Sequence, residues 1–170
     1  MDNKRFERER FSARSLRRYL ARSMLNLKAA PIDEKVVNLL DRVRAWARAR
    51  PDISAVALAG SHAHGRARPD SDVDLVILSD SPDPLRNGDW VGTFGTPTDV
   101  VTQQWGVLTA HRVSYSQFGE VEIGIAPSSW ADVPVDPGTR EVVRDGIIAI
   151  YDPRGALNRL VVEVLAEAAR

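Results

Sequence analysis

The chain has 170 residues, of which 44% are hydrophobic and 27% charged, and this composition fits a single soluble globular domain with a short appended element. It contains no cysteine, which excludes disulfide bonds and thiolate zinc sites and is compatible with the cytoplasmic location that we expect. Its apolar runs are too short to span a bilayer and its charged first residues do not resemble a secretory signal, so we expect no membrane contact.

The charge is distributed unevenly although the net charge is zero. Residues 1–50 carry 14 Lys and Arg against 6 Asp and Glu, a net charge of +8, and residues 51–170 carry a net charge of −8. The basic segment is either a helical element that packs on an acidic body or a surface for an anionic partner.

Two helices are predicted before residue 50. Residues 3–28 alternate arginines with apolar residues at steps of three to five, which is typical of an amphipathic helix. A second helix is predicted over residues 32–49, because Pro31 suits its first turn and Pro51 ends it. We therefore predict an N-terminal helical extension over residues 1–50 and a main domain over residues 51–170.

The main domain contains several apolar runs that end at glycine, proline or polar residues, as strands do. The strands are expected in "ISAVALAG" (53–60), "DVDLVILS" (72–79), "TDVVTQQWG", "VLTAHRVSYS", "GEVEIGIAP" (119–127) and "GIIAIYDP", with helices over 139–145 and 154–168. The turns between the third, fourth and fifth strands indicate a meander. This order predicts an α/β (α+β) domain with a mixed sheet flanked by helices.

Two aspartates interrupt the apolar strand at 72–79. Asp72 and Asp74 are two residues apart, so they share one face of the strand while the apolar residues face the core. Two adjacent carboxylates repel each other, and a divalent cation such as Mg²⁺ would relieve that repulsion. These aspartates are therefore candidate metal ligands, against the alternative of a solvated strand edge.

A Gly-Ser pair stands between the first predicted strand and "SHAHG", which reads as one helical turn that Ser61 could cap. Gly60 would let a ligand approach the backbone, and free N–H groups at a helix start favour phosphate. A phosphate cradle beside paired aspartates suits metal-assisted nucleotidyl transfer.

A third carboxylate is available in "GEVEIGIAP", where Glu120 and Glu122 share a face. We favour Glu122, since it lies deeper in the strand and its next neighbour on that face is Gly124, which leaves room for a substrate. Arg112, in the preceding strand, could pair with either glutamate.

The Gly-Ser pair, the ten residues that follow it and the triplet Asp-Val-Asp resemble the signature of the DNA polymerase beta-like nucleotidyltransferase superfamily. The similarity covers roughly residues 53–126. It is greatest to the small branch that holds aminoglycoside nucleotidyltransferases and the minimal nucleotidyltransferases paired with a HEPN protein. The resemblance implies the nucleotidyltransferase fold.

The resemblance also implies roles for single residues. Gly60 and Ser61 would bind the triphosphate, and Asp72 and Asp74 would bind two Mg²⁺ ions. Glu122 would be the third carboxylate, which contacts the metals and helps to activate the attacking hydroxyl. A glutamate there departs from the more common aspartate.

His64 occupies a position where this superfamily often has a basic or aromatic residue, so the resemblance implies that it lines the triphosphate pocket. Trp90, Trp105 and Trp130 are expected in the core or at a rim, where any of them could line an acceptor pocket.

The implied activity is Mg²⁺-dependent transfer of a nucleoside monophosphate, with AMP from ATP as the first candidate, to a hydroxyl of a small molecule or a protein. The alternative is an antitoxin-like partner of a HEPN protein that acts by binding it or by adenylylating it. Nucleic acid is not expected as a partner, because the acidic body would repel a phosphate backbone.

Overall fold

The computed structural model describes residues 32–168, so the helix predicted over 3–28 lies outside the described residues. The strands are β1 (Ile53–Ala59), β2 (Val73–Ser79), β3 (Pro97–Trp105), β4 (Leu108–Tyr115), β5 (Gly119–Pro127) and β6 (Ile147–Tyr151). The helices are α2 (Glu34–Arg48), α3 (Gly60–Ala63), α4 (Pro137–Arg144) and α5 (Ala156–Ala168), with short 3-10 turns at Asp83–Leu85 (η1), Asp89–Thr93 (η2) and Ser128–Ala131 (η3). Within 32–168, no helix has the length and apolar character that a membrane crossing requires.

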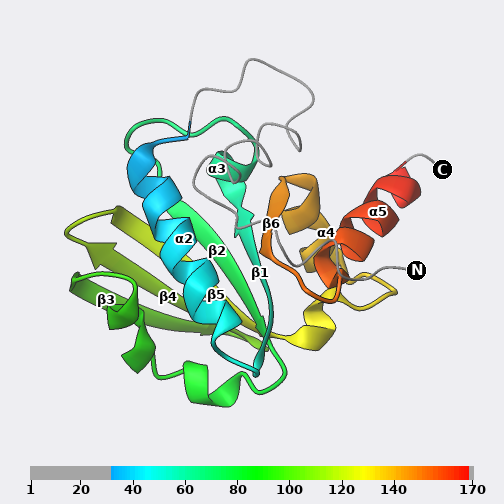
Figure 1. Cartoon of the computed structure of the whole chain (residues 1–170). Coiled ribbons are helices and arrows are strands. Elements are labelled where there is room, and N and C mark those ends of the chain that lie inside the picture. Colours follow the sequence, from blue (N-terminus) through cyan, green and yellow to red (C-terminus); the bar gives the residue numbers. More distant parts are fainter. Residues whose placement is uncertain (1–31, 169–170) are drawn as a thin grey trace, which may run out of the picture.

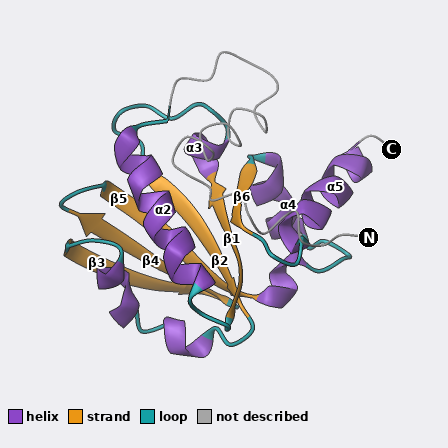
Figure 2. Ribbon diagram, viewed as in Figure 1, coloured by secondary structure: helices purple, strands orange, loops and turns teal. Residues whose placement is uncertain are grey.

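The six strands form one mixed sheet in the order β3-β4-β5-β2-β1-β6, with helices on both of its faces (Figures 1 and 2). β3, β4 and β5 are a meander of antiparallel neighbours, which confirms that prediction. The pairing of β2 with β5 is parallel, and β1 is antiparallel to both β2 and β6. The predicted α+β class, with a mixed sheet flanked by helices, is therefore confirmed.

The helix expected over 32–49 forms as α2 and crosses one face of the sheet (Figure 1). The Asp33 carboxylate caps it by accepting a hydrogen bond from the Lys35 N–H. Its apolar stripe packs on the buried side chains of the central strands, and Trp46 stacks on Trp90 with ring centroids 5.1 Å apart. α2 and the sheet thus share one hydrophobic core.

The opposite face of the sheet is covered at one end only. Leu157, Leu160 and Val164 of α5 pack with the small side chains of β1, whose Ala55 and Ala57 are fully buried. α4 and α5 lie together beside β6, whereas every residue of β3 is exposed (Figure 2). The β5-β4-β3 side of this face is therefore left open, and a cavity forms where the helices stop.

Candidate active site

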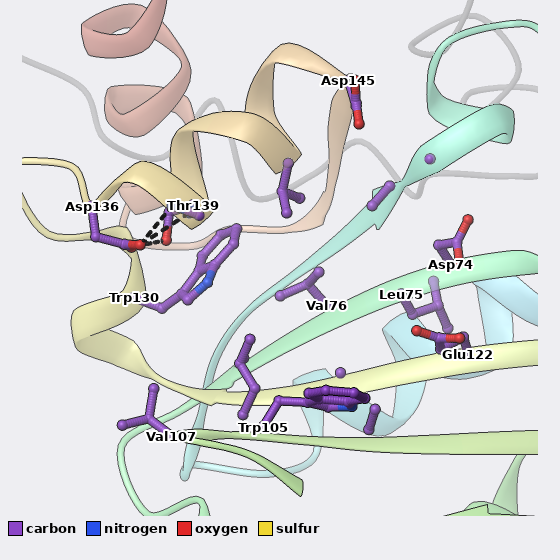
Figure 3. A pocket seen from close by; sticks show the side chains of 17 residues that line it. Asp74, Leu75, Val76, Trp105, Val107, Glu122, Trp130, Asp136, Thr139 and Asp145 are labelled. Carbon is purple, nitrogen blue, oxygen red and sulfur yellow. Dashed lines mark hydrogen bonds between the residues drawn. The ribbon is translucent and has the colours of Figure 1, made fainter. Parts of the chain in front are cut away.

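The two acidic strands place their carboxylates side by side at the open face. Asp74 of β2 is the register partner of Glu122 of β5, because the two strands are parallel and in contact. Both residues alternate with fully buried neighbours, so their side chains leave the core on the same side of the sheet. Figure 3 shows the two carboxylates together at one end of the cavity.

Gly60 approaches Asp74 from β1, where Ala59 is the register partner of Asp74. The chain turns from β1 directly into α3 at Gly60 with a φ of +62°, a conformation that residues with a Cβ adopt at a cost. A Cβ at this position would overlap Asp74 Oδ2 and lie 3.0 Å from Asp74 Cγ. Glycine is therefore required twice, by the backbone conformation and by the carboxylate beside it.

Ser61 does not cap α3, so that expectation is wrong. The helix begins one residue earlier, at Gly60, whose carbonyl oxygen accepts a hydrogen bond from the His64 N–H, and Ala59 at the N-cap offers no side-chain hydrogen bond. Ser61 lies in the first turn, half-buried. Its predicted role in triphosphate binding stays a prediction.

The two histidines after the Gly-Ser pair make separate contacts. His62 is buried, and its Nε2 lies 3.4 Å from the Ser71 carbonyl oxygen. His64 is exposed, and its Nδ1 lies 2.6 Å from the Asp145 carbonyl oxygen, which joins the end of α3 to the end of α4. His64 is not among the residues that line the cavity. Its contact with a nucleotide stays a prediction.

Arg112 pairs with both glutamates that the sequence offered. Its Nη2 lies 2.8 Å from Glu122 Oε2 and its Nε lies 3.1 Å from Glu120 Oε1. The pairing follows from the β4-β5 register, in which Arg112 is the direct partner of Glu122. Glu122, beside Asp74, is the one that lines the cavity, while Glu120 is further exposed at the start of β5.

Asp74 is the carboxylate of this group whose ionisation is disfavoured. Burial raises the pKa of Asp74 to about 6, with further contributions from the negative charges of Glu122 and Asp72, while Arg112 opposes the shift. Asp72 is exposed one residue before β2 begins. A divalent cation would stabilise the partly buried negative charge of these residues. Carboxylate oxygens such as those of Asp72, Asp74 and Glu122 are the hard ligands that Mg²⁺ prefers. The residues therefore fit a metal, although residues 32–168 contain no preformed cluster of three or more metal-binding side chains.

The cavity beside these carboxylates has a volume of about 510 Å³, within the ~300–1,000 Å³ range of small-molecule sites. Asp74 and Glu122 lie at one end (Figure 3), and Gly60, which packs against Asp74, lines the cavity too. Trp105 and Trp130 line it as well, so two of the tryptophans considered for an acceptor pocket face the cavity, whereas Trp90 is buried in the core.

One wall of the cavity, formed by α4 and the residue that follows it, contains no site residue predicted from the sequence. Thr139 and Asp145 line this wall, and nothing in their local sequence distinguishes them from surface residues. Their placement depends on the path of the chain from β5 through η3 to α4, which brings α4 back over the sheet (Figure 1).

Several solved structures are similar to the chain. They include an aminoglycoside 6-adenyltransferase from Bacillus subtilis (12% identity, 59% of this chain and 37% of that chain covered, TM-score 0.45) and a cytoplasmic RNA terminal U-transferase (18% identity, 66% and 36% covered, TM-score 0.45). A toxin-antitoxin structure with AMP-PNP shares 11% identity over 79% of this chain and 85% of that chain, with a TM-score of 0.37. The match spans little more than a third of the first two proteins. No curated protein sequence matches the chain significantly.

A model of the nucleotidyltransferase domain family matches residues 40–123. That segment runs from α2 to β5 and contains Gly60, Asp72, Asp74 and Glu122. The chain thus carries a domain of the nucleotidyltransferase family.

Proposed function

We propose that the protein transfers a nucleoside monophosphate from a nucleoside triphosphate to a hydroxyl group of an acceptor, with AMP from ATP as the first candidate. The observation that carries this proposal is the pairing of Asp74 with Glu122 beside the Gly60 turn. The nucleotidyltransferase family match over the same residues supports it.

The donor side of the reaction lies at Gly60. The close approach of this backbone to Asp74 leaves no side chain between the turn and the carboxylates, so phosphate oxygens can reach both. Ser61 follows in the first turn of α3 and is the nearest hydroxyl along the chain. These residues would orient the α-phosphate toward the Glu122 side of the site.

Asp72, Asp74 and Glu122 would hold divalent cations, Mg²⁺ being the first candidate. When bound, such ions lower the pKa of the acceptor hydroxyl and neutralise charge on the phosphates. The acceptor oxygen forms a bond to the α-phosphorus, and the bond from that phosphorus to the bridging oxygen breaks, which releases pyrophosphate. The hydroxyl proton passes to Glu122 or, through it, to water.

Arg112 would position Glu122 during this reaction. Its guanidinium bonds to Glu122 and Glu120 together, so it fixes the direction of the Glu122 side chain. Because Arg112 also lowers the pKa of Asp74, it favours the charge state that binds a cation.

The experiment combines binding with turnover. Asp74→Asn should abolish Mg²⁺-dependent ATP binding in calorimetry while the fold survives. Glu122→Gln should keep ATP affinity and lose pyrophosphate release in the presence of a library of small hydroxyl compounds. Glu120→Gln is the matched control from the same strand and should retain turnover. Equal loss in the two glutamine variants would contradict the assignment of Glu122.

The alternative role, as an interaction partner of a HEPN protein, places its contact surface on the basic N-terminal residues. Most of these precede residue 32 and lie outside the described part of the chain. This role stays a prediction, and co-purification with a HEPN protein would test it.

A further inference from the structure

The end of the cavity away from Asp74 is built from large apolar side chains that the proposed function leaves without a role. Trp105 is 66% exposed and Val107 is 62% exposed, although both line the cavity. Figure 3 shows Trp130 and Val107 on the side away from Asp74, with the Trp105 ring between Val107 and Glu122. Large exposed apolar side chains that gather at a concave site are typical of a surface that a ligand covers.

The order of the strands places this end on the acceptor side of the reaction. A row of register partners crosses the sheet from Ala59 through Asp74 and Glu122 to Arg112, in the strand order β1-β2-β5-β4. The triphosphate lies at the β1 end of this row, where Gly60 follows Ala59. An acceptor hydroxyl that reacts beside Glu122 must therefore bring the rest of its molecule over β5 and β4.

The floor of the cavity along that direction is flat and apolar. Gly124 of β5 and Ala110 of β4 are register partners, one step along their strands from Glu122 and Arg112 on the same face. Val76 of β2 continues the row on the other side of Gly124. Gly124 itself projects no side chain into the cavity, and a Cβ there would meet only the Leu75 carbonyl oxygen, at 3.7 Å. A flat molecule can lie on this floor against the ring of Trp105.

The charges of the lining disfavour an anionic occupant. All four titratable residues that line the cavity are acidic (Asp74, Glu122, Asp136 and Asp145), and no Lys or Arg of residues 32–168 lines it. The Asp136 carboxylate already accepts hydrogen bonds from the Gly138 and Thr139 N–H groups. Beyond the cations proposed at Asp74 and Glu122, an anion at the far end of the cavity would meet the charges of Asp136 and Asp145 without a compensating Lys or Arg, whereas tryptophan rings attract neutral rings and cations.

We propose that this cavity binds the acceptor as a small, planar, apolar ring compound that carries a hydroxyl and no negative charge. The ring lies on Gly124 and Ala110 with Trp105 and Trp130 beside it, and the hydroxyl points toward Glu122. This proposal rests on the proposed function for its direction. The shape and charge of the cavity support the binding itself without reference to the reaction.

The four tryptophans provide a test with an internal control. Trp105 and Trp130 line the cavity, while Trp46 and Trp90 stack in the core, where the Trp90 Nε1–H donates to the Leu85 carbonyl oxygen. The probes are three naphthalene alcohols that carry a trimethylammonium group, no charged group or a carboxylate. The readout is the set of four indole N–H signals in proton–nitrogen NMR spectra of the ¹⁵N-labelled full chain, assigned with tryptophan-to-phenylalanine variants.

The neutral and cationic probes should shift the Trp105 and Trp130 signals and leave those of Trp46 and Trp90 in place. The carboxylate probe should bind at least tenfold more weakly. Trp105→Ala should weaken the neutral probe at least tenfold, while Leu165→Ala, an exposed apolar residue of α5 outside the cavity, should not change its affinity.

Three results would overturn the proposal: equal affinity for the carboxylate probe, shifts of all four indole signals alike, or no shift with any probe. A titration with Mg²⁺–ATP distinguishes an acceptor site from a nucleobase site. If ATP alone shifts Trp105 and Trp130 and displaces the neutral probe, this end of the cavity holds the nucleobase instead. Failure of ATP to bind at all would contradict the proposed function and leave probe binding to be judged separately.

Discussion

Replacement of Gly60 by alanine tests whether the backbone turn and the carboxylate site depend on each other. The added Cβ has two separate effects. It forces alanine into a φ of +62°, which costs about 1–2 kcal/mol in the left-handed region. It also lies 3.0 Å from Asp74 Cγ, so the carboxylate must retreat by roughly 0.5–1 Å to reach the ~3.5–4.0 Å of ordinary carbon contact.

Gly106 separates the two effects, because its φ is +58° but a Cβ there would meet nothing within 4 Å. Gly106→Ala and Gly60→Ala should each lower the free energy of unfolding by about 1–2 kcal/mol, measured by urea titration. Only Gly60→Ala should weaken Mg²⁺–ATP binding, by tenfold or more in calorimetry. Equal ATP affinity in the two variants would refute the claim that the Gly60 turn and Asp74 form one site.

Three further predictions concern ionisation. Because the pKa of Asp74 is raised to about 6, the folded state loses stability relative to the unfolded state as the pH rises from about 4 to about 6. Asp74→Asn should remove this loss of stability. Its free energy of unfolding at about pH 8 should exceed that of the wild type by about 1–2 kcal/mol after solvent screening is allowed for, and the two should not differ near pH 3. A variant that is less stable than the wild type at pH 8 would argue against a raised pKa of Asp74. His111 is fully buried between the Leu85 carbonyl oxygen and the Thr102 hydroxyl, and burial lowers its pKa, so stability should fall as the pH drops below about 6.5. In urea titrations at several pH values, His111→Gln should reduce this fall in the free energy of unfolding below about pH 6.5. If the fall is unchanged, another titratable group causes it. Arg112→Met should raise the pKa of Asp74 further, since the positive charge of Arg112 opposes the upward shift in the wild type. An NMR titration of the Asp74 carboxyl carbon measures this pKa, and an unchanged value would show that Arg112 does not act on Asp74.

The sequence was enough to predict which candidate site residues lie in one local pattern and share a face. Gly60, Asp72 and Asp74 occur within fifteen residues as strand, turn and strand, and alternation along a strand fixes which side chains share a face. The choice of Glu122 over Glu120 followed from its deeper position in the strand and from the neighbouring Gly124 on the same face. The structure adds the register that makes Glu122 the partner of Asp74.

The remaining parts depended on contacts between distant segments. From the sequence, Arg112 could pair with either Glu120 or Glu122. It pairs with both, because the β4-β5 register sets it opposite Glu122 and within reach of Glu120. Ser61 was expected as a cap, yet the helix starts a residue earlier, at Gly60, whose carbonyl oxygen accepts from the His64 N–H. Asp145 and Trp130 reach the cavity only through the path of η3 and α4, which no local pattern indicates.

The most direct test of the central claim is a calorimetric titration of the full chain with ATP, GTP, CTP and UTP, with and without Mg²⁺, beside the Asp74→Asn variant. The wild type should bind at least one triphosphate in a Mg²⁺-dependent manner, and the variant should lose this binding. Binding that persists unchanged in Asp74→Asn, or no binding of any triphosphate to the wild type, would contradict the central claim.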